Sequence, residues 1–132
     1  TMGVRVTFEV LVQISENTQE LKELGKSPPW KGTCDLLDDG GTWRQRILTG
    51  AVNVLVDLNG LANGRLLAIK TNQTITFRKN SAVGEPWTIR PMGTGALDGV
   101  FLATTDGITS LYFSNAGSLD AEVTISLGGM VA

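Results

Sequence analysis

The first fifteen residues alternate between apolar and polar side chains over an unusually long run. The even positions are Val4, Val6, Phe8, Val10, Val12 and Ile14, and the odd positions are Arg5, Thr7, Glu9, Leu11, Gln13 and Ser15. Successive side chains of a strand point to opposite faces, so this pattern predicts one long strand over 4–15 with one buried face. Leu11 interrupts the polar face, and we expect it to contact another element or a partner.

The same alternation returns near the end of the chain. Leu119, Ala121, Val123, Ile125 and Leu127 lie on one side, and Asp120, Glu122, Thr124 and Ser126 on the other. Just before this run, Leu111 and Phe113 alternate with Tyr112 and Ser114, and residues 114–118 (SNAGS) are typical of a turn. The pattern predicts a β-hairpin over 108–129.

Residues 16–30 break the strand period and predict an excursion, either a short helix or a loop. Asn17 can cap a helix, and Glu20 stands three residues later, as in a capping box. Gly25 can close the helix, and Pro28 and Pro29 forbid its continuation. We therefore expect two turns of helix over 18–24, or a loop in their place.

The rest of the chain consists of short apolar runs separated by turn residues. The expected strands cover 32–37, 43–47, 51–58, 65–70, 73–79, 87–91 and 100–105. Turn signals stand at 38–41, 59–60, 63–64 and 106–107, and residues 71–72 are expected to join a hairpin over 65–79. About nine short strands at this spacing favour an antiparallel β-sandwich over a parallel α/β sheet. We predict an all-β, single-domain, jelly-roll-like sandwich that spans residues 1–132.

The composition adds an argument for assembly. Of the 132 residues, 18% are charged and 42% are hydrophobic, and the mean hydropathy is +0.08. Soluble domains average about 25% charged residues, so part of this surface is expected to be covered by neighbours. A neutral surface rich in Thr, Ser, Asn and Gly would give the same figures and stays open as an alternative.

Charge and cysteine content exclude several classes of function. The net charge is −2, and the concentrated positive patch that nucleic-acid binding needs is missing from the sequence. No apolar run approaches the roughly 20 residues of a membrane-spanning helix. Cys34 is the sole cysteine, so no disulfide can form within the chain, and we expect it to be a small buried hydrophobe.

The sequence contains few signs of a catalytic site. It contains no histidine, which removes Ser-His-Asp and Cys-His arrangements and the usual zinc sites. Most of its aspartates lie within two residues of a Gly or Asn, where turn formation accounts for them. We therefore expect no catalytic, metal-binding or cofactor-binding residue, and no enzymatic activity.

The large aromatic side chains are the remaining candidates for a binding role. Trp30 follows two prolines, Trp43 opens an expected strand, and Trp87 follows Pro86. Such rings more commonly serve a core or a subunit contact, whereas sugar-binding sandwiches use exposed rings for stacking. Trp30 is expected to be the most exposed. Together with Leu11 and Tyr112, the three tryptophans are the candidate interface residues.

Two long stretches follow each other from about residue 50 onward: LTGAVNVLVDLNGLANGRLLAIKTNQTITFRKN and GVFLATTDGITSLYFSNAGSLDAEVTISLGG, the second with its alternating last strand ending in Gly-Gly. In the order of these parts the chain resembles small β-rich virion proteins of tailed bacteriophages. The resemblance implies a structural protein, such as a capsid decoration (cement) protein or a neck or tail accessory subunit. It also implies a place in the virion after synthesis in the bacterial cytoplasm, with a major capsid or tail protein as partner.

Two expectations about binding follow. The first is self-association, with a trimer favoured, through the first strand, the 16–30 excursion and the 108–129 segment, because a long unpaired strand invites pairing. The second, an alternative from a different class, is a carbohydrate- or receptor-binding module at a virion tip.

Overall fold

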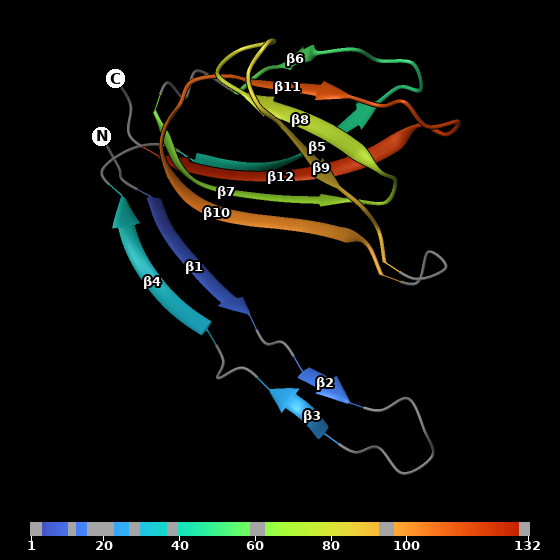
Figure 1. Ribbon diagram of the computed structural model, residues 1–132. Coiled ribbons are helices and arrows are strands. Elements are labelled where there is room, and N and C mark those ends of the chain that lie inside the picture. Colours follow the sequence, from blue (N-terminus) through green and yellow to red (C-terminus); the bar gives the residue numbers. More distant parts are fainter. Residues whose placement is uncertain are drawn as a thin grey trace.

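The computed structural model describes residues 4–10, 13–15, 23–26, 30–36, 40–58, 63–92 and 97–129. Every regular element within these ranges is a β-strand. The strands form a sandwich and a ribbon that extends away from it (Figure 1). The ribbon comprises β1 (Val4–Val10), β2 (Gln13–Ser15), β3 (Glu23–Lys26) and β4 (Trp30–Leu36).

Eight strands build the sandwich as two antiparallel sheets of four. The first, which we call the β12 sheet, has the order β10-β7-β12-β5. It contains β5 (Gly40–Ile47), β7 (Gly64–Thr71), β10 (Gly99–Ile108) and β12 (Ala121–Gly129). The second, the β8 sheet, has the order β6-β11-β8-β9. It contains β6 (Val54–Val56), β8 (Ile75–Lys79), β9 (Pro86–Ile89) and β11 (Leu111–Ser114). The predicted all-β antiparallel sandwich is confirmed.

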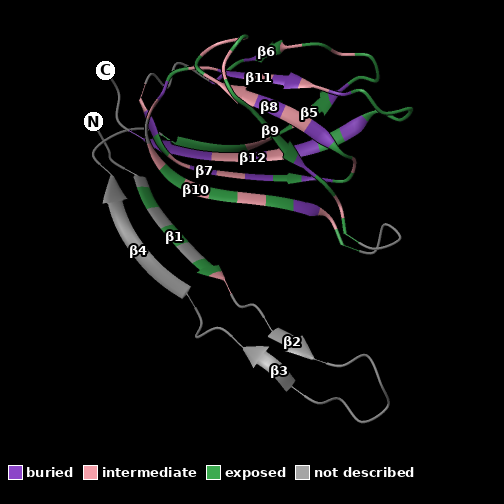
Figure 2. Ribbon diagram, in the orientation of Figure 1, coloured by how far each residue is buried: buried purple, intermediate pink, exposed green. Residues whose placement is uncertain are grey.

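The alternation along each strand decides which side chains enter the core. In β12 the alternate residues Ala121, Val123, Ile125 and Leu127 are at most 2% exposed, whereas Glu122 faces solvent. The β8 sheet contributes Phe77 and Phe113, whose ring centroids lie 6.0 Å apart. Figure 2 shows this buried layer along the strands of both sheets. Full burial of each such side chain contributes roughly 1.5–3 kcal/mol.

Two expected hairpins are wrong in the same way. In 108–129, β11 pairs with β6 and β8, whereas β12 pairs with β5 and β7. In 65–79, β7 likewise belongs to one sheet and β8 to the other. The connecting residues therefore cross between sheets. Alternation reveals that a strand has a buried face, but both sheets of a sandwich share one core, so it leaves the pairing partner open.

Asn115 shows how the crossing between β11 and β12 is held. Its side chain is 0% exposed, and its Nδ2 donates to the carbonyls of Ile47 at 3.0 Å and Leu119 at 2.9 Å. Its Oδ1 accepts the backbone N–H of Gly117 at 3.0 Å. Its own N–H donates to the Ala51 carbonyl, and its carbonyl accepts from Gly50 N–H. The buried amide of Asn115 thus hydrogen-bonds to the backbone of the turn and also connects the turn to the end of β5.

Three further expectations are corrected in detail. The expected strand over 51–58 is shortened to β6, and Val52 is 75% exposed. Residues 40 and 41, placed in a turn, belong to β5. Residues 106–107 do not end the strand either, because β10 continues to Ile108 with a register shift after Thr104. Gly107 takes φ +60°, the left-handed conformation that a bulge accommodates more readily than a regular ladder.

The helix expected over 18–24 is wrong where the structure describes it. Residues 23–26 form β3, and Gly25 pairs with Ile14 of β2. A helix of two turns that lacks tertiary packing is marginal in water, and pairing with the preceding strand satisfies the same backbone groups. Residues 16–22 and 27–29, which also belong to the expected excursion, lie outside the described residues.

Candidate assembly surface

The ribbon has two chemically different faces. In its register Val4, Val6, Phe8 and Val10 of β1 stand opposite Leu36, Cys34, Gly32 and Trp30 of β4. Directly opposed residues of an antiparallel pair share a face, so all eight of these positions lie on one face. The intervening pairs are Arg5–Asp35, Thr7–Thr33 and Glu9–Lys31. One face of the ribbon is therefore apolar in sequence, and the other pairs opposite charges and two threonines.

The ribbon is two strands wide, and among the described strands β1 pairs with β4 and β2 with β3, not with a strand of the sandwich. Arg5, Thr7 and Glu9 are exposed, and Val10 is partly exposed (Figure 2). An isolated two-stranded ribbon is marginally stable at best, because it has no second layer to cover its apolar face. A surface that covers this face would stabilise the ribbon.

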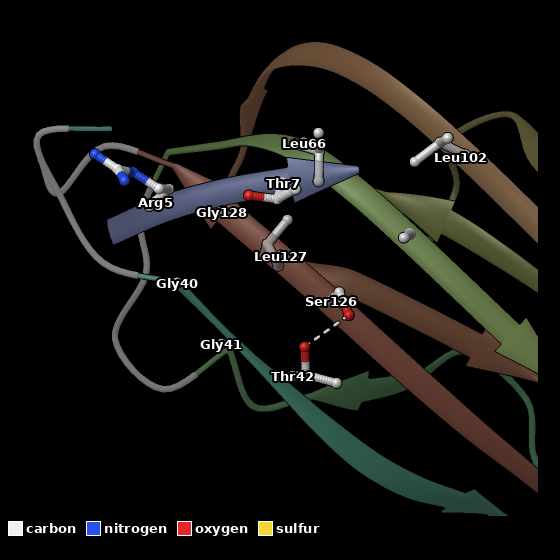
Figure 3. Close-up of a pocket in the computed structure, with 11 residues that line it drawn as sticks. Arg5, Thr7, Gly40, Gly41, Thr42, Leu66, Leu102, Ser126, Leu127 and Gly128 are labelled. Atoms are coloured by element: carbon white, nitrogen blue, oxygen red, sulfur yellow. Dashed lines mark hydrogen bonds between the residues drawn. The ribbon is translucent and has the colours of Figure 1, made fainter. Parts of the chain in front are cut away.

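The ribbon meets the sandwich at a groove on the outer face of the β12 sheet (Figure 3). The groove has a volume of about 390 Å³, and Arg5 and Thr7 of β1 form one wall. Its floor is lined by Gly40, Gly41, Thr42, Leu66, Ala68, Leu102, Ser126, Leu127 and Gly128. Most of these side chains are small, which leaves room for β1 to pass over the sheet. Thr42 and Ser126 share a hydrogen bond of 2.7 Å across β5 and β12. Arg5 and Thr7, which line the groove, belong to the polar face of the ribbon.

The outer face of the β12 sheet carries both charged and apolar side chains. At one end Arg46 Nε donates to Glu122 Oε1 at 2.8 Å, and this hydrogen bond, together with the carboxylate charge, raises the pKa of the Arg46 guanidinium. Lys70 Nζ lies 3.5 Å from Asp98 Oδ2 on the same face. On the same face β10 presents apolar side chains, and one of them, Val100, stands directly opposite Lys70.

The apolar side chains of β10, together with those of Met92 and Leu97 before it, form an exposed stripe. Leu97 is 58% exposed, Val100 68% and Leu102 41%. Met92, which bridges to Leu97, is 65% exposed. We call Met92, Leu97, Val100 and Leu102 the β10 stripe. It reaches the groove, because Leu102 belongs to both.

The structure places the sequence-predicted candidates in different parts of the molecule. Trp43 on β5 packs against the core, and its Nε1 is buried without an acceptor among the described residues. Trp87 on β9 is 49% exposed, and its ring lies 5.7 Å from that of Phe101 at the open side of the sandwich. Tyr112 is partly exposed on the outer face of the β8 sheet, between Leu55 and Arg78.

Trp30 and Leu11 are the remaining candidates. Trp30 begins β4 and stands opposite Val10 in the register, but its side chain lies outside the described residues, as does that of Cys34. Leu11 lies outside them altogether. The β10 stripe was not among the predicted sites, although residues 100–103 (VFLA) give a signal for it: a strand that is apolar at every position has an apolar outer face as well.

Within the described residues, no three acidic, cysteine or histidine side chains converge as metal ligands would. In the same part of the chain, no helix is long and apolar enough to cross a membrane.

Comparisons of the chain with protein-family models, with curated proteins and with solved structures find no match.

Proposed function

We propose that the chain is a non-enzymatic structural subunit of a bacteriophage virion, a capsid decoration (cement) protein or a head–tail or tail accessory protein. In this function it self-associates, with a trimer favoured, and binds a lattice of a major capsid or tail protein. The observation that carries the proposal is the ribbon, whose register places the apolar positions of β1 and β4 opposite one another on one face. The low charged fraction and the resemblance of residues 50–129 to phage virion proteins support it.

The ribbon favours assembly over an isolated existence for an energetic reason. Its apolar positions gain free energy only where another surface removes them from water, at about 25 cal/mol per Å². A subunit that works in a closed, symmetric assembly offers such a surface to every copy equally.

The proposed fold within the sandwich class is an eight-stranded jelly roll. Jelly rolls contain eight strands in two sheets, connected as two Greek keys. The strand orders β10-β7-β12-β5 and β6-β11-β8-β9 support this proposal. So do the crossings, because each connection in β5–β12 apart from β8–β9 passes from one sheet to the other.

A carbohydrate- or receptor-binding module at a virion tip is the second candidate function. Its support is Trp87, which keeps half of its surface exposed and could stack on a sugar ring. The contact of Trp87 with Phe101 gives the same ring a packing role at the open side of the sandwich, so we rank this candidate second.

Composition of virus particles tests the proposal. Purified particles of the phage that encodes the chain should contain it in a copy number that matches the symmetry of the shell, neck or tail, as measured by quantitative mass spectrometry. Immunogold labelling should place it on the shell, neck or tail tube. Absence from normally assembled particles would contradict the proposal, and labelling confined to the tail tip would favour the second candidate.

A further inference from the structure

We infer that the outer face of the β8 sheet docks on a partner protein that presents a carboxylate side chain, and that Arg78 binds this carboxylate. The inference rests on the proposed function, because it assigns the surface through which the chain contacts the capsid or tail protein. It is carried by the surroundings of Arg78, which the structure describes in full side-chain detail.

The guanidinium of Arg78 is held in place by two hydrogen bonds. Its Nε donates to the carbonyl of Gly84 at 3.0 Å, and its Nη1 donates to Asn53 Oδ1 at 2.7 Å. A guanidinium has five N–H donors, so these two bonds leave three donors for a ligand. Because Arg78 is partly buried and already ordered, binding costs it less conformational entropy than it would cost a mobile side chain.

The acceptor on Asn53 is itself positioned by an uncommon backbone conformation. Asn53 has φ +48°, in the left-handed region that Asn tolerates better than most residues. Its N–H donates to Ser114 Oγ at 2.8 Å, and the Ser114 hydroxyl donates to its Oδ1 at 3.2 Å. Backbone conformations of this kind cost free energy and cluster at functional positions. Asn53 thus spends backbone freedom to direct its side-chain oxygen at Arg78.

The charge of Arg78 has no counterion among the described residues. Both of its hydrogen-bond acceptors are uncharged, and it forms no ion pair there, not even with Glu85 of the neighbouring turn. The four strands of the β8 sheet contain no Asp or Glu. Lys79 alternates with Arg78 and donates to Thr105 Oγ1 of β10 at 3.0 Å, so Arg78 is the charge that these strands present on the outer face. The complement of this face is therefore an anion, and the planar fork of a guanidinium matches the two oxygens of a carboxylate.

The side chains beside Arg78 favour a protein as the source of this carboxylate. The register places Leu55, Tyr112, Arg78 and Pro86 in one row across the four strands. Leu55 is 60% exposed, and its burial requires an apolar group next to the carboxylate. An acidic sugar would leave this apolar surface in water, whereas a protein supplies both groups. Tyr and Arg are also the residues in which the energetically important parts of protein interfaces are enriched.

The substitution Asn53→Asp separates recognition from a merely structural role of Arg78. It keeps the oxygen that accepts from Arg78 and Ser114, and Asp also tolerates the left-handed conformation. If Arg78 only holds the fold, this variant behaves as the wild type does. If Arg78 binds a partner's carboxylate, the new carboxylate occupies it from within the chain. Asn72→Asp is the matched control, since Asn72 lies on the other sheet and its Oδ1 accepts the N–H of Glu122 at 2.8 Å.

A second variant acts on the same face without touching the hydrogen bonds of Arg78. Leu55→Asp replaces an exposed side chain, removes the apolar contact and repels the partner's carboxylate. It decides the question if Asn53→Asp does not fold, which circular dichroism shows.

Binding to virus particles provides the measurement. Particles of the encoding phage that were assembled without the chain are mixed with each purified variant and sedimented, and the bound chain is quantified. We expect Asn53→Asp and Leu55→Asp each to raise the dissociation constant more than about tenfold, and Asn72→Asp to leave it unchanged.

The other outcomes overturn the inference in distinguishable ways. If folded Asn53→Asp and Leu55→Asp bind as the wild type does, the face is overturned as the docking surface and the proposed function stands. If polygalacturonate, an acidic polysaccharide, binds the wild type but not Asn53→Asp, the anion is a glycan and the protein partner is overturned. A wild-type chain that does not bind the particles also overturns the inference, and its copy number in natural particles then decides the proposed function separately.

Discussion

Replacing Asn115 by alanine should lower the free energy of unfolding by about 2–4 kcal/mol. The substitution removes three hydrogen bonds of a side chain that is 0% exposed. It leaves the carbonyls of Ile47 and Leu119 and the N–H of Gly117 without this partner, and an unsatisfied buried group costs about 1–3 kcal/mol. Urea unfolding followed by circular dichroism measures the change.

The control for this substitution is Ser118→Ala. Ser118 is exposed in the same connection, so its replacement should change stability by less than about 0.5 kcal/mol. Equal stability of the two variants would show that the crossing between β11 and β12 does not depend on the buried amide.

Replacing Phe113 by alanine should cost about 3–5 kcal/mol, the usual loss for a phenylalanine in a packed core. Phe113 is 0% exposed, lies in the middle of the β8 sheet beside Phe77, and fills the space between the sheets. The truncation removes this ring contact and leaves a cavity. Thermal unfolding should show a midpoint well below that of the wild type.

The neighbouring ring provides the control. Tyr112 precedes Phe113 on β11 but points to the outer face of the β8 sheet and is partly exposed. Tyr112→Ala should therefore cost much less than Phe113→Ala. If the two substitutions cost the same, the assignment of inner and outer faces along β11 would be wrong.

The faces of the strands could be predicted from the sequence because alternation is a local property. Of the predicted inner residues, Ala121, Val123, Ile125 and Leu127 of β12 are buried, whereas Leu119, which precedes the strand, is 61% exposed. The partners of each strand could not be predicted in this way. Residues 111–129 look like a hairpin because two alternating runs flank a turn, but the turn contains Asn115, whose buried hydrogen bonds hold it as a crossing between sheets.

The prediction of a helix over 18–24 was wrong for a related reason. Asn17, Glu20 and Gly25 are local signals for a helix, and local signals say nothing of a strand that lies beside them. The register of β2 with β3 places Gly25 opposite Ile14, and this pairing continues the ribbon of β1 and β4. The pairing of β2 with β3 outweighs the weak local preference of residues 18–24 for a helix.

The candidate site was predicted in part. The apolar period of residues 4–15 identified the strand that became the ribbon, and the expectation that a long strand needs a cover led to self-association. The β10 stripe was not predicted. Residues 100–103 are apolar at every position, so the sequence does not show which face of the strand is turned away from the core.

The mass of the purified full chain in solution tests the central claim, that the apolar face of the ribbon is covered by another copy. Light scattering at micromolar concentration should give a discrete mass that is a multiple of the 14.1 kDa chain, with three copies favoured. A mass of one chain at every concentration measured would contradict the claim.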